Sequence, residues 1–132
     1  MILVDSSTWI NYFNGVDTLS TNLLDKKLST DRLLVGDLIL TEVLQGFRSD
    51  HDFNTAKKIL ASFEQVNLIN QELALKSAKN YRTLRAKGLT VRKTIDVIIA
   101  TFCIENFIEL LHDDKDFLPM QQYLKLQIPS SE

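Results

Sequence analysis

Residues 2–8 read Ile-Leu-Val-Asp-Ser-Ser-Thr, and this stretch predicts a strand, a turn and the start of a helix. The three apolar residues 2–4 are typical of a short buried strand, which ends at Asp5. The hydroxyl groups of residues 6–8 are suited to cap a helix that continues through Trp9, Ile10, Tyr12 and Phe13. These residues therefore predict a strand followed directly by a helix.

The same alternation continues along the chain. Apolar runs predict further strands at 33–35, 66–69 and 108–111, with a last edge strand at 126–128. Apolar residues at helical spacing predict helices over 18–28, 39–47, 52–64, 71–87, 95–107 and 117–124. This order favours the α/β class, as a three-layer α/β/α sandwich with a mostly parallel central sheet. We expect residues 1–132 to form a single domain of this kind.

The helix predicted over 71–87 has two contrasting faces. Its apolar face is expected to point inward and to contain Ala74, Leu75, Ala78, Tyr81 and Leu84. The basic residues on its other face advance by three along the helix: Lys76, Lys79, Arg82 and Arg85. The helix over 95–107 is almost wholly apolar, which predicts that it is buried. Cys103 is expected to be a small core residue of that helix.

Composition and charge narrow the function classes. The apolar share of 45% and the charged share of 24% are those of an ordinary globular protein. A single cysteine excludes a disulfide within the chain and suits the cytoplasm. The apolar stretch 97–104 is too short to span a membrane. The net charge of −2 disfavours a simple nucleic-acid binder, although residues 73–95 contain seven basic residues and no acidic one.

Acidic residues fall where the strands are predicted to end. Because ligands of parallel sheets bind beyond the carboxyl ends of the strands, we expect the functional site at this edge. The acidic residues at the edge are Asp5, Glu42, Asp96, Asp114 and Asp116. Each of them alone is also explained as a turn residue or a residue that complements a helix dipole.

The acidic set as a whole favours a divalent cation. Converging carboxylates raise one another's pKa unless a cation lies between them, and Asp5 and Asp96 adjoin apolar segments where an unpaired charge is costly. Oxygen ligands alone point to Mg²⁺, for which Mn²⁺ substitutes. Zinc is disfavoured, because Cys103, His51 and His112 do not have the spacing of zinc ligands. A magnesium site at an open sheet edge suits phosphodiester hydrolysis by metal-activated water.

Basic residues close to this edge suit a polyanionic substrate. Arg92 and Lys93 stand just before Asp96 and are expected to steer a polyanion toward the acidic site. The basic stripe within 76–87 is explained equally well as a solvated outer face.

Four segments resemble the PIN-domain ribonucleases, and among them the VapC toxins of VapBC type II toxin–antitoxin pairs. These segments are 4–10 (Val-Asp-Ser-Ser-Thr-Trp-Ile), 40–46 (Leu-Thr-Glu-Val-Leu-Gln-Gly), 91–100 (Val-Arg-Lys-Thr-Ile-Asp-Val-Ile-Ile-Ala) and 110–117 (Leu-Leu-His-Asp-Asp-Lys-Asp-Phe). The resemblance implies a magnesium-dependent endoribonuclease that acts as a toxin.

The resemblance also implies roles for individual residues. Asp5, Glu42, Asp96 and Asp114 would bind the metal and carry catalysis, and Asp116 would be an additional or supporting ligand. Ser7 would contribute through its hydroxyl, in contact with substrate. Spacing alone does not rank Asp113, Asp114 and Asp116. The family pattern selects Asp114, which stands two residues before Asp116-Phe117 and leaves Asp113 as the spectator.

The implied partners are RNA, a second copy of the chain in a homodimer, and a cognate VapB-like antitoxin that fills the active groove. Trp9, Tyr12, Phe13, Leu44 and Phe47 could form an apolar groove for the antitoxin, although Trp9 and Phe13 are better explained as core.

Two other function classes remain open from the sequence. A phosphoacceptor receiver domain has a similar length and similar acids at the sheet edge. It also needs an acidic pair after the first strand and a phosphorylatable aspartate after a central strand, and no apolar strand delivers an aspartate near residue 52. The other class is a PIN fold without activity that only binds RNA or protein, which an intact acidic set argues against.

Overall fold

A parallel sheet forms the centre of the computed structural model, which describes residues 1–130. The strands are β1 (Ile2–Val4), β2 (Leu33–Gly36), β3 (Glu64–Val66) and β4 (Glu109–Leu111), in the order β3-β2-β1-β4. All three neighbouring pairs are parallel, with Leu3 opposite Leu34 on one side and Leu110 on the other. The predicted α/β class with a parallel central sheet is therefore confirmed.

Helices connect the strands and cover both faces of the sheet. They are α1 (Ser6–Phe13), α2 (Leu19–Lys27), α3 (Asp37–Leu44), α4 (Asp50–Ala61), α5 (Gln71–Ala86), α6 (Thr94–Glu105), the 3-10 turn η1 (Lys115–Phe117) and α7 (Leu118–Tyr123). Side chains of Asp5, Thr18, Ser49 and Asn70 cap the first turns of α1, α2, α4 and α5 by accepting hydrogen bonds from backbone N–H groups. Within residues 1–130, no helix is long and apolar enough to cross a membrane.

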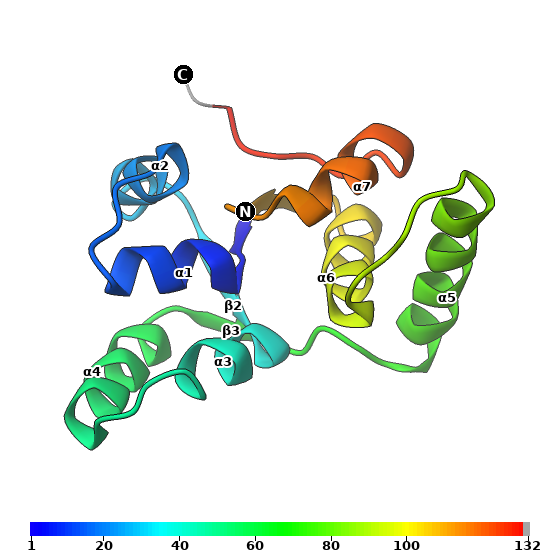
Figure 1. The fold of residues 1–132 in the computed structure, drawn as a ribbon. Coiled ribbons are helices and arrows are strands. Elements are labelled where there is room, and N and C mark those ends of the chain that lie inside the picture. Colours follow the sequence, from blue (N-terminus) through cyan, green and yellow to red (C-terminus); the bar gives the residue numbers. More distant parts are fainter. Residues whose placement is uncertain (131–132) are drawn as a thin grey trace.

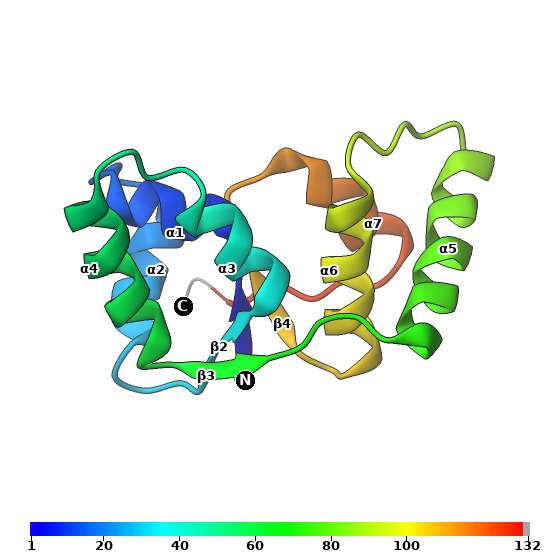
Figure 2. The same cartoon turned by 90° about the horizontal axis from the view of Figure 1, so that it is seen from below.

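Strand order determines which helices lie on which face. The chain steps in one direction from β1 to β2 to β3, and then crosses back over the sheet to β4. Because crossovers between parallel strands are right-handed, reversing the direction moves the connecting helices to the opposite face. Figures 1 and 2 show α1 to α4 on one side of the sheet and α5 to α7 on the other. The direction changes between β1 and β4, which is where such sheets bind ligands.

Two strand predictions are corrected by the structure. The third strand occupies 64–66 and not 66–69, so it begins where the preceding helix was expected to continue. It is an edge strand with exposed Glu64 and Gln65, and it lacks the apolar run on which the prediction relied. The strand expected at 126–128 does not form. The backbone N–H of Leu110 donates to the carbonyl of Gln127, but this segment makes no ladder with β4.

The inner face of α5 is also corrected. The buried residues are Leu73, Ser77 and Leu84, whereas Leu75 is 62% exposed and Ala74 and Ala78 are exposed. Asn80 on the same helix donates to the hydroxyl of Thr101 on α6 at 2.9 Å. The face that packs on α6 is therefore partly polar, which apolar periodicity does not detect.

The core lies around the sheet and the first helix. Residues 2–4 are fully buried, as expected for a central parallel strand. Trp9 is buried as well, and its ring stacks on Phe13 with centroids 5.8 Å apart. Trp9 is therefore a core residue and does not line an exposed groove. Cys103 is buried on α6, which confirms the expectation for it.

Gly36 is the position in the sheet where an added methyl group would be most costly. A Cβ there would lie 2.6 Å from Cδ1 of Leu68, a buried side chain. We expect Gly36→Ala to destabilise the protein by about 1–3 kcal/mol, because overpacking forces neighbouring groups to move. Thermal unfolding measures this effect. Gly46→Ala is the control, since its Cβ would meet no heavy atom closer than 3.5 Å, and an equal loss in both variants would contradict the prediction.

Candidate metal centre

Asp5 is fixed at the carboxyl end of β1. Its backbone N–H donates to the carbonyl of Leu111, the last residue of β4, at 2.9 Å. Its Oδ2 accepts hydrogen bonds from the backbone N–H of Ser7 at 3.0 Å and from the Ser7 hydroxyl at 2.6 Å. The residue is only 3% exposed, and its Oδ1 is buried without a hydrogen-bond partner among residues 1–130. One oxygen of Asp5 is thus held by the protein, and the other is available to a ligand.

Ser7 connects the two strand ends that form this edge. While its hydroxyl donates to Asp5, it accepts a hydrogen bond from the backbone N–H of Asp113 at 2.9 Å. The segment after β1 is therefore tied to the segment after β4 through one side chain. This arrangement supports a positioning role for Ser7, and contact with substrate stays a prediction.

Glu42 approaches the same place from α3. Its Oε1 accepts a hydrogen bond from the Ser6 hydroxyl at 3.1 Å, so neighbouring serines hold the two carboxylates of Asp5 and Glu42. The sequence pattern predicts only a helix-capping role for Ser6 and does not reveal this contact. Its position directly after Asp5 was the one available signal.

Asp96 lies in the first turn of α6, on the opposite face of the sheet from α3. It is 4% exposed, and its Oδ2 is the second buried carboxylate oxygen in the described chain that has no hydrogen-bond partner. An unpaired buried carboxylate is costly unless it is protonated or contacts a cation. The buried, unpaired carboxylate oxygen of Asp96 therefore indicates that a cation binds here.

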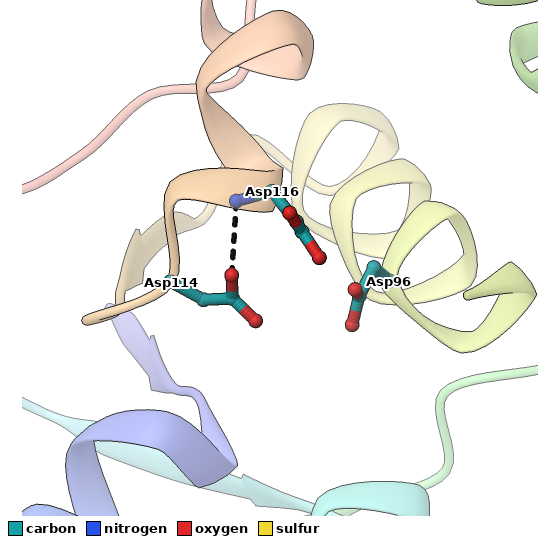
Figure 3. A group of neighbouring side chains, drawn as sticks. All are labelled: Asp96, Asp114 and Asp116. Carbon is teal, nitrogen blue, oxygen red and sulfur yellow. Dashed lines mark hydrogen bonds between the residues drawn. The ribbon is translucent and has the colours of Figure 1, made fainter. Parts of the chain in front are cut away.

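Asp114 and Asp116 complete the cluster from the segment after β4. Asp114 caps η1, and its Oδ1 accepts a hydrogen bond from the backbone N–H of Asp116 at 2.9 Å. Figure 3 shows both carboxylates turned toward Asp96. One carboxylate oxygen from each of the three residues lies within 4.8 Å of the others, an arrangement that could hold a metal ion.

Asp113 is turned away from this cluster. Its Oδ2 accepts hydrogen bonds from the side chains of Asn11 at 3.0 Å and Thr18 at 2.9 Å. The carboxylate therefore fastens the segment after β4 to α1 and to the start of α2, as a structural residue would.

The acidic residues share one hollow of about 250 Å³. Asp5, Glu42, Asp96 and Asp114 line it, together with Lys93 and both serines. The structure thus brings together carboxylates from four separate segments of the chain, as the sheet-edge argument expected. Asp116 belongs to the neighbouring trio with Asp96 and Asp114.

Burial raises the pKa values of these acids. Burial raises the pKa of Asp5 above its usual value, and the hydrogen bonds from Ser7 offset part of the effect. Burial is also the main cause of the raised pKa of Glu42, which the Ser6 hydroxyl lowers and the Asp5 charge raises. The pKa of Asp96 rises to about 7, chiefly through burial, while nearby Lys93 lowers it and Asp5 raises it. The nearby positive charge of Lys93 therefore does not balance the negative charge of the carboxylates in this site.

These observations fit a divalent cation. Within residues 1–130, two buried carboxylate oxygens lack hydrogen-bond partners, the candidate ligand atoms are all hard oxygens, and the acids perturb one another's pKa values. A cation in the hollow would satisfy the unpaired oxygens and remove the repulsion.

The family model of the PIN domain matches residues 2–121. The chain belongs to the PIN domain family. This membership decides against the phosphoacceptor receiver domain that the sequence alone left open.

Relatives of this PIN domain match nearly the whole chain. Ribonuclease VapC11 from Mycobacterium tuberculosis is 28% identical over 132 residues, which cover 98% of each protein. Among solved structures, VapBC2 from Rickettsia felis bound to a promoter DNA fragment contains a chain that superposes with a TM-score of 0.78 at 16% identity, over 98% of both chains. VapBC-1 from nontypeable Haemophilus influenzae gives a TM-score of 0.73 at 17% identity, over 99% of this chain and 98% of that one. At these identities the structures support the fold of the PIN domain.

Basic residues of this PIN domain differ in their distance from the acids. Lys93 lines the acidic hollow, and Arg92 lies 3.9 Å from an Asp116 oxygen. Lys76, in contrast, pairs with Glu105 at 2.6 Å, at the far end of α6 from Asp96. The start of the basic stripe on α5 is thus separate from the candidate site.

Ser7→Ala is expected to lower RNA cleavage by roughly 10–100-fold, the usual cost of losing a residue that orients a ligand. The substitution removes the hydroxyl that holds Asp5 and accepts from Asp113. Initial rates at saturating and limiting Mn²⁺ measure the effect, and a higher Mn²⁺ requirement distinguishes ligand positioning from lost substrate contact. Ser7→Thr, which restores a hydroxyl, is the matched rescue variant. Full activity of Ser7→Ala would contradict the assignment.

Proposed function

We propose that this PIN domain is a metal-dependent endoribonuclease and acts as the toxin of a VapBC-type toxin–antitoxin pair. The observation that carries the proposal is the convergence of Asp5, Glu42, Asp96 and Asp114 on one hollow, in which two buried carboxylate oxygens lack a hydrogen-bond partner in the described part of the chain. A relative that matches over nearly the whole chain is named a VapC ribonuclease. This likeness supports RNA as the substrate.

Mg²⁺ is the proposed cation, and Mn²⁺ is expected to replace it. Asp5, Glu42, Asp96 and Asp114 would hold it, with Asp116 as an additional or supporting ligand. When bound, the cation supplies a water molecule of lowered pKa and neutralises charge on the scissile phosphodiester. The hard carboxylate oxygens suit these ions better than zinc.

The protein's own residues perform the remaining tasks. Ser6 and Ser7 fix the carboxylates of Glu42 and Asp5 by hydrogen bonds, so that little reorganisation is needed when the substrate binds. Lys93 lines the hollow and supplies positive charge beside the acids. Arg92 is 69% exposed in its side chain, and it can reach a phosphate that approaches Asp116.

The proposed partners follow from the same relationship. Complexes named VapBC are similar in fold to this chain, which supports a VapB-like antitoxin as its inhibitor. We extend the proposal to a homodimer that acts in the cytoplasm, where its RNA substrates are found.

Cleavage of RNA by the purified protein tests the proposal. We expect single-stranded RNA to be cut when Mn²⁺ or Mg²⁺ is present, and the reaction to stop when EDTA removes the metal. Asp114→Asn is expected to abolish cleavage, whereas Asp113→Asn, the same change one residue away on a carboxylate outside the cluster, keeps it. RNA binding without cleavage under all metal conditions would overturn the proposal in favour of an inert binding module.

A further inference from the structure

A second hollow, of about 350 Å³, adjoins the acidic cluster. It lies between the end of α5, the segment 89–92, η1 and the start of α7. Asp96 and Asp116 form part of its wall, and Asp96 also lines the acidic hollow. The two hollows therefore share Asp96 in their walls and lie side by side.

The hollow is apolar inside and cationic where it meets the acids. Leu84 and Met120, both buried, contribute to it together with the partly buried Leu89 and Val91. The basic side chains of Arg92 and Lys115 stand beside Asp96 and Asp116 in the same lining. Apolar walls suit an uncharged planar group, while the cations suit a phosphate attached to it.

Solvent-accessible hydrogen-bonding groups lie in the lining. Thr90 is exposed, and among residues 1–130 neither its hydroxyl nor its backbone N–H has a hydrogen-bond partner; the backbone N–H of the half-buried Val91 has none either. Leu89, by contrast, is fixed through its N–H to the carbonyl of Leu84 at 3.1 Å. An anchored segment thus presents free donors next to apolar walls, a combination suited to the polar edge of a heteroaromatic ring.

We propose that this second hollow binds one unstacked nucleobase of the RNA, next to the phosphodiester that is cut; the inference rests on the proposed ribonuclease function. The base contacts Val91, Leu118 and Met120, and its edge faces Thr90. Its phosphate runs past Arg92 and Lys115 toward the acids. Continuity with the acidic cluster and the two cations at the junction favour a nucleotide over a purely apolar occupant. Proteins that recognise single-stranded RNA commonly bind bases that are splayed out of the stack.

Abasic substitution tests the hollow without changing the protein. The probe is a short single-stranded RNA whose cut site has been mapped with the wild-type protein and Mn²⁺. Abasic nucleotides are then placed one at a time on either side of the cut. We expect one adjacent position to lower kcat/KM by about tenfold or more, since a bound base buries its apolar faces against the aliphatic lining of the hollow, whereas distant positions have little effect.

The variant Leu118→Ala tests whether the loss of kcat/KM with abasic RNA arises in the second hollow. Leu118 lines it and is 53% exposed, so the variant should fold normally. We expect it to lower kcat/KM for unmodified RNA and to reduce the abasic penalty, because the two changes remove the same contact. Leu75→Ala is the control, a 62% exposed leucine on α5 that does not line the hollow, and it should retain the full penalty.

Several results would overturn the inference. Cleavage of unmodified RNA with no penalty at any adjacent position eliminates the base site but leaves the ribonuclease intact. An abasic penalty of equal size in wild type and Leu118→Ala also eliminates it. If Leu118→Ala leaves RNA kinetics unchanged but weakens binding of an antitoxin peptide, the hollow holds protein instead. Failure to cut any RNA overturns the proposed function and this inference with it.

Discussion

Asp96→Asn is expected to lower RNA cleavage by more than about a hundredfold and yet to raise the melting temperature of the metal-free protein. Loss of a residue that only orients a ligand costs roughly 10–100-fold, so loss of a direct ligand should cost more. The gain in stability has a separate cause. Asp96 is buried, one of its oxygens has no hydrogen-bond partner among the described residues, and its pKa is raised to about 7. Asparagine keeps the shape and removes a charge that the folded state disfavours.

The two effects are measured on the same preparations. Cleavage rates are determined with saturating Mn²⁺, and melting temperatures are determined in EDTA at pH 8. Asp113→Asn serves as the control in both assays, because that carboxylate contacts Asn11 and Thr18 outside the acidic cluster. A variant that is inactive but also less stable without metal would indicate that Asp96 has a structural role in the fold.

Metal binding is expected to raise the melting temperature and to change its dependence on pH. A ligand present at a hundred times its Kd stabilises the folded state by about 2.7 kcal/mol. For a domain of this size, that corresponds to a rise on the order of 10 °C. The ordinary pKa of aspartate is 3.8, and that of Asp96 in the folded, metal-free protein is about 7. The folded state therefore binds the proton more tightly than the unfolded state does.

The sign of the pH effect follows from this difference. The contribution of Asp96 to stability is fully present below pH 3.8 and is lost as the pH rises toward 7. Without metal, wild type should therefore lose more stability between pH 5 and pH 8 than Asp96→Asn does. Because the cation binds ionised carboxylates, the stabilisation by metal should instead grow over the same interval. Equal pH profiles of wild type and Asp96→Asn in EDTA would contradict this account.

Local signals predicted most of the fold. The fully buried residues 2–4, the helix after Asp5 and the helix that ends before Gly88 all follow from apolar periodicity and capping. The third strand did not, because Glu64 and Gln65 join the sheet only through pairing with β2. The inner face of α5 was missed for a similar reason. Ser77 is buried against a neighbouring helix, a tertiary effect that hydropathy cannot reveal.

The convergence of the acids at the strand ends was predictable, but spacing did not show which of the neighbouring aspartates after β4 belong to the cluster. Spacing could not separate Asp113 from Asp114, since they are neighbours in the short segment after β4. Contacts in the folded protein separate them, because the Asp113 carboxylate accepts hydrogen bonds from the side chains of Asn11 and Thr18, away from the acidic cluster. The support that Ser6 gives to Glu42 spans 36 residues in sequence and depends on the packing of α1 against α3.

The reversal of direction between β1 and β4 has a consequence for biosynthesis. Asp5 is synthesised long before Leu111, whose carbonyl accepts a hydrogen bond from the backbone N–H of Asp5. Contacts of such long range form late in folding. A nascent chain that stops short of residue 109 lacks both β4 and the aspartates that follow it. The proposed ribonuclease site can therefore be completed only after residues 109–116 have been translated.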